Sequence, residues 1–351
     1  ASGAFRFRYG LTRTNGFSAT AVHPATMALS DSFISFGTQL KIEKPTKGCA
    51  VSSCDSIDGP IVKLTDGSVK QVNSLEEAHR LYPLVSEIIY FGDILIPLSD
   101  VVNRNYELIR SGYVEEWWEL ELKKADSSVN LDSREVSFDK AVEISKTYGL
   151  PLHPRYIYYW SQISYEQFLS LIDWIAHGSK IENGFILPYV SSDRERFAKA
   201  KRALEVLGCE HLVTSDYVVI SNPDAQAILI NLGVEYSEKD IPAALENLVT
   251  RVSSLPGKNV LENLNLLSSL KIKDKAGTFI GSRMGRPEKA KLRKLIGSPH
   301  VLFPVGDEGG RLRSFQAALE VGSVSSEFPI FVCTKCKEDS VFPICLKCGG
   351  E

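Results

Sequence analysis

Four cysteines near the end of the sequence have the spacing of a metal site. They form two Cys-x2-Cys pairs with eight residues between the pairs. Thiolates arranged in two such pairs suit a tetrahedral structural Zn²⁺, and four protein ligands leave no open position for catalysis. Two disulfides or an iron–sulfur cluster are the alternatives. We therefore predict a structural zinc site with the ligands Cys333, Cys336, Cys345 and Cys348.

A second stretch that could do chemistry is strongly basic, although the chain as a whole has a net charge of −3. Between residues 271 and 294, nine basic residues stand against two acidic ones, Asp274 and Glu288. A local positive excess on an acidic background indicates a positioned anion site rather than general attraction to polyanions. The nine are Lys271, Lys273, Lys275, Arg283, Arg286, Lys289, Lys291, Arg293 and Lys294.

The second half of the basic stretch has the pattern of a short helix. Pro287 suits the first helical position, and a glycine ten residues later is a natural stop. Lys291 and Lys294 are three residues apart and share one face of this helix, and Lys289 and Arg293 share the neighbouring face. The alternative is a solvated helix face whose cations point into water.

The first half of the stretch is rich in glycine. Gly277, Gly281 and Gly285 make it a poor helix former. A strand and turns that bring the backbone close to a ligand are expected instead. Arg283 and Arg286 lie just before the helix start, where free backbone N–H groups point outward. Together these parts are predicted to surround a chain of phosphates.

No catalytic metal site is recognisable among the acidic residues. Nucleotide polymerisation by two metal ions needs clustered carboxylates, but no tight Asp-x-Asp pair occurs, and turn or capping roles are predicted for the candidates. There is also no G-x-x-x-x-G-K-[ST] phosphate loop and no Ser/His/Asp set. The acidic candidates are Asp55, Asp58, Asp93, Asp100, Asp307 and Glu308, and the histidines expected to be structural are His23, His153 and His300, each beside a proline.

The N-terminal part that would position these residues has the pattern of a β-domain. "FRFRYG" alternates apolar and basic side chains, as a two-sided strand does. Asp66-Gly67 lies between two alternating runs and indicates a hairpin. "EIIYFGDILIPLSD" has the pattern of a buried strand with a Gly-Asp turn inside it. Many short strands with Gly and Pro punctuation favour a barrel or compact β-domain.

From about residue 113 to 270 the pattern becomes helical. Ser137 as a cap and Gly149 as a stop frame one amphipathic helix, and another ends at Gly208. A short strand pair interrupts the helices. The sequence therefore predicts an α+β fold.

Bulk properties place limits on the class of protein. The 351 residues are 44% hydrophobic and 24% charged, which suits two or three globular domains. No apolar run is long enough for a membrane span and no basic-then-apolar leader is visible, so neither is expected. The seven cysteines are not dense and evenly spaced, so a reducing compartment is favoured over a secreted disulfide scaffold.

Several stretches resemble the large subunit of the archaeal family D DNA polymerase. The longest are "KDKAGTFIGSRMGRPEKAKLRK" and "VLFPVGDEGGRLRSF". "GFSATAVHPATM", "GTQLKIEKPTKG", "CDSIDGPIVKLTDGSV", "FGDILIP" and "YVEEWW" are similar to that family as well, so the resemblance covers nearly the whole chain. The cysteine cluster also falls where that family has a zinc module.

The resemblance implies a catalytic core of two double-psi β-barrels and template-directed DNA synthesis with Mg²⁺. It implies that Lys291 and Lys294 project toward the active centre as catalytic residues. The family's metal-binding carboxylates belong to an Asn-x-Asp-Gly-Asp motif that is absent here, so this chain looks like an internal piece that would not polymerise alone. Contacts to phosphate or nucleic acid are implied for Lys275, Arg283, Arg286, Lys289, Arg293, Arg311 and Arg313.

The resemblance also implies partners. These are primer–template DNA and dNTPs, a small subunit with 3′–5′ exonuclease activity, and a sliding clamp, in a cytoplasmic, nucleoid-associated setting without a membrane. Two rival interpretations are a non-catalytic zinc-containing module that only clamps nucleic acid, and a piece that serves subunit assembly.

Four segments are predicted on this basis. Residues 1–113 and 271–327 together form one double-psi β-barrel, with the basic motif in the second part. Residues 114–270 form an inserted, mainly helical accessory module. Residues 328–351 form the zinc-binding module.

Overall fold

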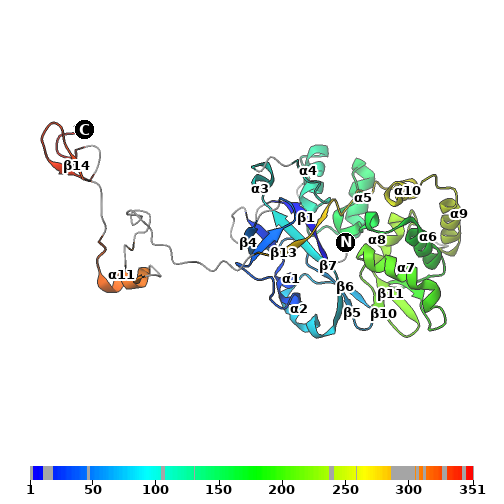
Figure 1. Cartoon of the computed structure of the whole chain (residues 1–351). Coiled ribbons are helices and arrows are strands. Elements are labelled where there is room, and N and C mark those ends of the chain that lie inside the picture. The colour runs from blue at the N-terminus through cyan, green and yellow to red at the C-terminus, as the bar shows by residue number, and fades with distance from the viewer. Residues whose placement is uncertain are drawn as a thin grey trace. The chain divides into compact units, whose positions relative to one another are not determined.

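The chain folds into two compact units, Ala1–Arg286 and Pro287–Glu351 (Figure 1). The architecture is a mixed α/β fold. A computed structural model describes residues 3–10, 19–45, 48–103, 107–129, 131–236, 241–257, 259–285, 305, 308–310, 314–325, 330–341 and 345–350.

A nine-stranded sheet forms the core of the N-terminal part of the first unit. Its strands are β1 (Ala4–Tyr9), β2 (Thr20–Val22), β3 (Gln39–Ile42), β4 (Gly48–Ser53), β5 (Ile61–Leu64), β6 (Val69–Gln71), β7 (Val85–Ile96), β12 (Phe279–Ile280) and β13 (Ser282–Met284). The order is β12-β1-β7-β2-β4-β3-β13, and β5 pairs with both β6 and β7. The β1–β7 and β2–β4 pairs are parallel, and the other pairs are antiparallel.

The two ends of this strand order are neighbours in sequence. β12 pairs with β1 at one end, β13 pairs with β3 at the other, and only Gly281 separates β12 from β13. The sheet must therefore curl until its ends meet, and in Figure 1 the gold strand β13 lies among the blue and cyan strands. β12 and β13 confirm the strand predicted for the glycine-rich stretch. A Cβ at Gly277 would lie only 2.3 Å from the backbone of Ser111, so the close approach there requires glycine.

β1 and the β5–β6 hairpin confirm the sequence prediction, but the turn expected inside β7 is wrong. β7 runs through Gly92 without reversing. Between the pairs Ala4–Tyr90 and Arg6–Asp93, β1 advances by two residues while β7 advances by three, which is a bulge. Gly92 has φ +81°, and a Cβ there would lie 2.5 Å from the carbonyl oxygen of Asp58.

A cluster of buried charges lies on one face of β1. Asp93 is fully buried and accepts from Arg6 Nε at 2.5 Å, from Arg6 Nη2 at 2.8 Å and from Arg8 Nη1 at 2.8 Å. Arg6 Nη2 also donates to Asp58 at 2.9 Å, and Arg8 Nη2 donates to Glu116 at 2.6 Å. Burial alone would raise the pKa of Asp58, but the Arg6 guanidinium holds it well below its usual range. Asp58 and Asp93 are therefore ion-pair residues, not the turn or cap residues that the sequence predicted.

The alternating pattern of β1 places apolar side chains on the opposite face. Phe5 and Phe7 pack with Leu40, Ile94 and Ile280 in an apolar core inside the curled sheet. Three short helices accompany the strands: α1 (Pro24–Leu29), α2 (Leu75–Leu81) and α3 (Leu98–Val102), with the 3-10 turn η1 (Tyr82–Leu84).

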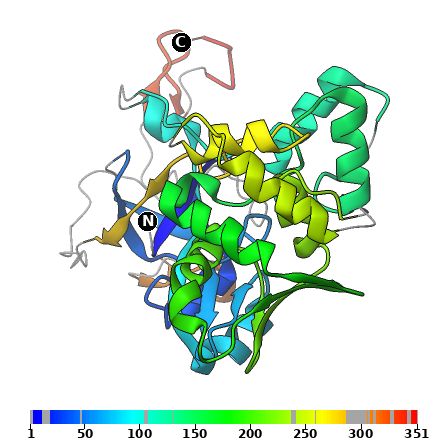
Figure 2. The ribbon, with the colours of Figure 1, turned by 90° about the vertical axis from the view of Figure 1, so that its right-hand side faces the viewer.

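Residues 113–272 supply a separate and larger apolar core. Its helices are α4 (Glu115–Ala125), α5 (Phe138–Tyr148), α6 (Tyr165–Ala176), α7 (Arg194–Leu207), α8 (Asp224–Asn231), α9 (Ile241–Val252) and α10 (Val260–Leu267), with η2 (Pro154–Tyr156) and η3 (Trp160–Gln162). Its sheet has the order β10 (Leu212–Val213), β11 (Tyr217–Ser221), β9 (Gly184–Pro188), β8 (Ser179–Ile181). In Figure 2 the green and yellow helices lie in front of the blue strands. The Ser137 cap and the Gly149 stop of α5, and the Gly208 stop of α7, are confirmed.

Polar contacts tie the helical part to the large sheet. Arg202 on α7 donates twice to Glu87 on β7, at 2.8 Å each. The Tyr90 hydroxyl donates to the carbonyl of Val206 at 2.7 Å. These contacts are consistent with one compact unit. The boundaries at residues 113 and 270 stay a prediction.

The described residues of the second unit form α11 (Phe315–Val321) and a small hairpin of β14 (Phe331–Val332) and β15 (Asp339–Ser340). Across the described ranges of both units, no helix is long and apolar enough to cross a lipid bilayer.

We predict that Asp93→Asn lowers the free energy of unfolding by about 3–5 kcal/mol, because it leaves two buried guanidiniums without their shared countercharge. Urea denaturation followed by circular dichroism measures this change. Asp173→Asn is the control, since Asp173 is half exposed and pairs with an equally exposed Arg196, so a loss below about 1 kcal/mol is expected. Equal losses in the two variants would contradict a special role for the buried cluster.

Candidate functional site

Two of the predicted phosphate-binding residues, Lys275 and Arg283, belong to the described part of the chain, and they line different cavities. The other predicted site residues of the basic region, both expected catalytic lysines included, lie outside the described residues. These are Arg286, Lys289, Lys291, Arg293, Lys294, Arg311 and Arg313.

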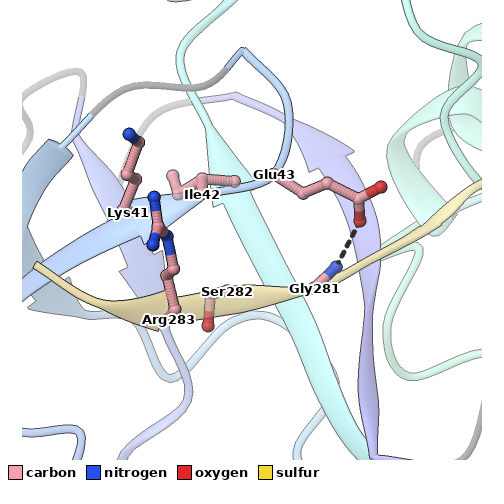
Figure 3. Close-up of a pocket in the computed structure, with 6 residues that line it drawn as sticks. All are labelled: Lys41, Ile42, Glu43, Gly281, Ser282 and Arg283. Atoms are coloured by element: carbon pink, nitrogen blue, oxygen red, sulfur yellow. Dashed lines mark hydrogen bonds between the residues drawn. The ribbon is translucent and has the colours of Figure 1, made fainter.

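Arg283 lies on β13 directly opposite Lys41 on β3. Figure 3 shows the two side chains pointing to the same side of the strand pair. They line a cavity of about 310 Å³ together with Gly281 and Ser282. Like charges directly opposite each other on a sheet repel and destabilise the pair. An anion placed between them would remove that repulsion.

Glu43 lines the other end of the same cavity. Its carboxylate accepts a hydrogen bond of 2.9 Å from the backbone N–H of Gly281, which Figure 3 marks with a dashed line. The carboxylate therefore supports the joint between β12 and β13. The two cations stand apart from it at the opposite end (Figure 3).

Lys275 lies in a second cavity of about 340 Å³, where Asp58, Glu115, His153 and Arg155 also line the wall. Its side chain is 92% buried (8% exposed). Burial lowers the pKa of Lys275, and the neighbouring Asp58 only partly opposes this. Mixed charges of both signs do not favour a phosphate here as strongly as at Arg283.

His23 and His153 are structural, as expected. The ring of His23 accepts from the backbone N–H of Ala25 and begins α1. His153 Nδ1 accepts from the N–H of Arg155 while Nε2 lies 2.7 Å from the carbonyl of Ser133. His300 lies outside the described residues.

The four predicted metal ligands come together in the second unit. Their Sγ atoms all lie within 4.8 Å of one another, and three of the pairs are 3.5 Å apart. A tetrahedral zinc with Zn–S bonds of about 2.3 Å needs sulfur atoms roughly 3.8 Å apart, so the four thiols fit Zn²⁺. The structural-zinc prediction is supported by this geometry.

The two Cys-x2-Cys turns are closed in the same way. Lys337 N–H donates to the carbonyl of Cys333 at 3.0 Å, and Gly349 N–H donates to the carbonyl of Cys345 at 2.9 Å. Both donors have left-handed backbones, with φ of 64° and 67°. The backbone N–H of Cys336 also lowers the pKa of Cys333 to about 6, which favours the thiolate that binds metal.

Sequence reasoning missed Lys41 and the ionic role of Asp93. A single lysine in a strand pattern has no signature of its own, and its importance comes from the register with Arg283. Asp93 follows a glycine and so has the local pattern of a turn. Its partners Arg6 and Arg8 are more than 80 residues away in sequence.

Comparison with protein families matches residues 1–351 to "DNA polymerase II large subunit DP2, central domain". The chain belongs to this family. The DNA polymerase II large subunit of Methanothermobacter thermautotrophicus is 37% identical over 361 residues, covering 99% of this chain and 30% of the relative. That of Pyrococcus horikoshii is 36% identical over 394 residues, covering 99% of this chain and 26% of the relative. The chain therefore spans less than a third of the length of these relatives.

We predict that the 351-residue chain binds one Zn²⁺ and that Cys336→Ser removes it, because four thiolates complete the tetrahedron. Metal content after gel filtration, measured by mass spectrometry, checks this stoichiometry. Cys49→Ser is the matched control, since Cys49 lies on β4 outside the cluster and should leave one zinc per chain. Iron or no metal in the unsubstituted chain would refute the zinc assignment.

We also predict that His153 makes the free energy of unfolding depend on pH. Burial lowers the pKa of His153 to about 4 from its ordinary 6.5, so the folded state takes up the proton later than the unfolded state. Its contribution to stability is complete above pH 6.5 and is lost as pH falls toward 4. Between these values His153→Gln should flatten the dependence of unfolding free energy on pH by up to about 1.4 kcal/mol per pH unit. Urea titrations at several pH values measure both slopes, and unchanged slopes would reject the assignment.

Proposed function

We propose that this chain is part of the catalytic large subunit of a replicative DNA-directed DNA polymerase. In this proposal it supplies basic phosphate-contacting residues to a nucleotidyl-transfer site whose metal-binding carboxylates lie outside the chain. The observation that carries the proposal is the match of residues 1–351 to the DP2 central-domain family. The dense basic stretch at residues 271–294 supports it, because phosphate transfer needs cations around the reacting groups.

The proposed scaffold is a double-psi β-barrel built from residues 1–113 and 271–327. Two parallel strand pairs, β1–β7 and β2–β4, and a sheet whose ends meet at Gly281 support this proposal. Residues 114–270 would be an accessory module inserted into the barrel, and their separate apolar core supports that division. Residues 328–351 would form the zinc module.

The proposed reaction is nucleotidyl transfer. The 3′-hydroxyl oxygen of the primer bonds to the α-phosphorus of a dNTP, the bond to the bridging oxygen breaks, pyrophosphate leaves, and the hydroxyl proton passes to solvent. Lys291 and Lys294 would offset negative charge that develops on the transferring phosphate and on the leaving pyrophosphate. Lys275, Arg283 and the remaining basic residues would hold the phosphates of DNA or nucleotide. Mg²⁺, bound by carboxylates elsewhere in the subunit, would lower the pKa of the attacking hydroxyl.

The proposed partners follow from the same assignment. Primer–template DNA and dNTPs are the substrates, and the chain would act in the cytoplasm with the nucleoid. A small subunit with 3′–5′ exonuclease activity and a sliding clamp would complete the enzyme.

We predict that Lys291→Ala combined with Lys294→Ala, in the complete two-subunit enzyme, lowers the rate of primer extension by about 100-fold or more. Duplex affinity should change by less than about 5-fold, because catalytic cations act mainly on the transition state. Single-turnover extension and fluorescence anisotropy measure the two quantities. Lys124→Ala is the control for loss of one surface charge.

Two outcomes would contradict the catalytic assignment. Equal losses of rate and affinity, with a smaller salt dependence of binding, would identify a phosphate clamp instead. Unchanged rate and affinity, with loss of subunit association, would identify an assembly piece.

A further inference from the structure

The cation pair Lys41 and Arg283 has no acidic partner among the residues that the structure describes. The pairing of β13 with β3 places Lys41 and Arg283 directly opposite each other. The repulsion between their two positive charges therefore follows from the strand register. Lys41 is half-buried and Arg283 is exposed. This pair is therefore a solvent-reachable place for one anionic group, at backbone positions that the strand register fixes.

An apolar cavity adjoins the pair. It has a volume of about 520 Å³ and shares Gly281, Ser282 and Arg283 with the cavity of the cation pair. Phe5, Phe33 and Phe91 are the aromatic side chains on its wall. Arg283 thus lies between a site for negative charge and a space lined by rings.

Phe33 is 65% exposed. Its position is fixed by the tight end of α1. Asp31 and Ser32 both have left-handed backbones, with φ of 52° and 57°, and Phe33 N–H donates to the carbonyl of Ser30 at 2.9 Å. Two successive left-handed residues without glycine are strained, and such strain persists where the surrounding structure holds it.

We propose that single-stranded DNA occupies these two cavities, with a phosphate between Lys41 and Arg283 and the adjoining base stacked on Phe33. Cations along a backbone track and exposed rings for stacking are the two features by which proteins hold single strands. This inference rests on the proposed function, since it assigns a strand contact to the same subunit. The segment beyond Arg283 leads directly into the basic Gly-Arg-Pro motif, so the subsite and that motif are consecutive in the chain.

The geometry favours a nucleic-acid strand over an acidic peptide. A carboxylate side chain could meet the cations, but a peptide has no obligatory flat ring at the next position. A nucleotide always places a π-face within one sugar of its phosphate, which matches adjoining cavities that share Arg283.

The test uses the complete subunit that contains this chain and a 12-mer of deoxythymidine with one central 5-iododeoxyuridine. Without dNTPs or Mg²⁺, irradiation should join the iodinated base to Phe33, and fragment mass spectrometry locates the bond. Phe33→Ala should abolish this crosslink and weaken binding of the 12-mer by about 5- to 100-fold. Phe36→Ala is the matched control, because Phe36 is 71% exposed and only three residues away but does not line the cavity.

The salt dependence of binding tests the contact between Lys41 and the phosphate. Lys41→Ala should reduce the slope of log affinity against log salt by about 0.7, the value for one phosphate of a single strand. Lys124→Ala, which removes a surface lysine on α4, should leave this slope unchanged. A crosslink at other residues, equal effects of Phe33→Ala and Phe36→Ala, or an unchanged slope in Lys41→Ala would each overturn the subsite. Because no extension is measured, these outcomes are independent of whether the enzyme is a polymerase.

Discussion

The first unit depends on the ion pairs that the buried carboxylate of Asp93 makes with Arg6 and Arg8. β1 lies between β12 and β7, and its two faces are both covered, so the arginines that alternate with Phe5 and Phe7 have no route to water. Taking two guanidiniums out of water is costly, and only a well-placed anion with several hydrogen bonds offsets that cost. Asp93 provides it from the neighbouring strand. The bulge at Gly92 brings Asp93 into register with Arg6, so backbone geometry and charge pairing require each other.

The same cluster reaches beyond the sheet. Asp58 belongs to the segment before β5, and Glu116 belongs to α4, so one group of charges joins two strands, a loop and the first helix of the helical part. On the other side of β1, β12 continues into β13 and therefore into Arg283. The position of Arg283 opposite Lys41 is thus determined by pairing with β3 and by the chain that leads in from β12. A cation pair held in this way keeps its spacing without an ion-pair partner among the residues that the structure describes.

Features with a local cause could be predicted from the sequence. The caps of α5, the glycine stop of α7 and the β5–β6 hairpin depend on residues within a few positions of one another. The cysteine site is local too, because each Cys-x2-Cys turn supplies two ligands. The features that the sequence did not predict depend on contacts between residues far apart in the chain. Gly92 and Asp93 have the pattern of a turn until β1 is known to be their neighbour, and Lys41 has no meaning until β13 is known to return from more than 200 residues away.

Gly281, the single residue between β12 and β13, determines which side chains of β13 face each side of the strand pair. Side chains along a strand alternate with a period of two, so one added or removed residue at this joint would turn Arg283 to the far side of the strand pair while leaving Phe279 beside β1. The one-residue length of this connection therefore couples the register of β12 on β1 to the register of β13 on β3. Its chemistry can be altered by replacing side chains, but its length cannot be altered without exchanging which residues face the solvent.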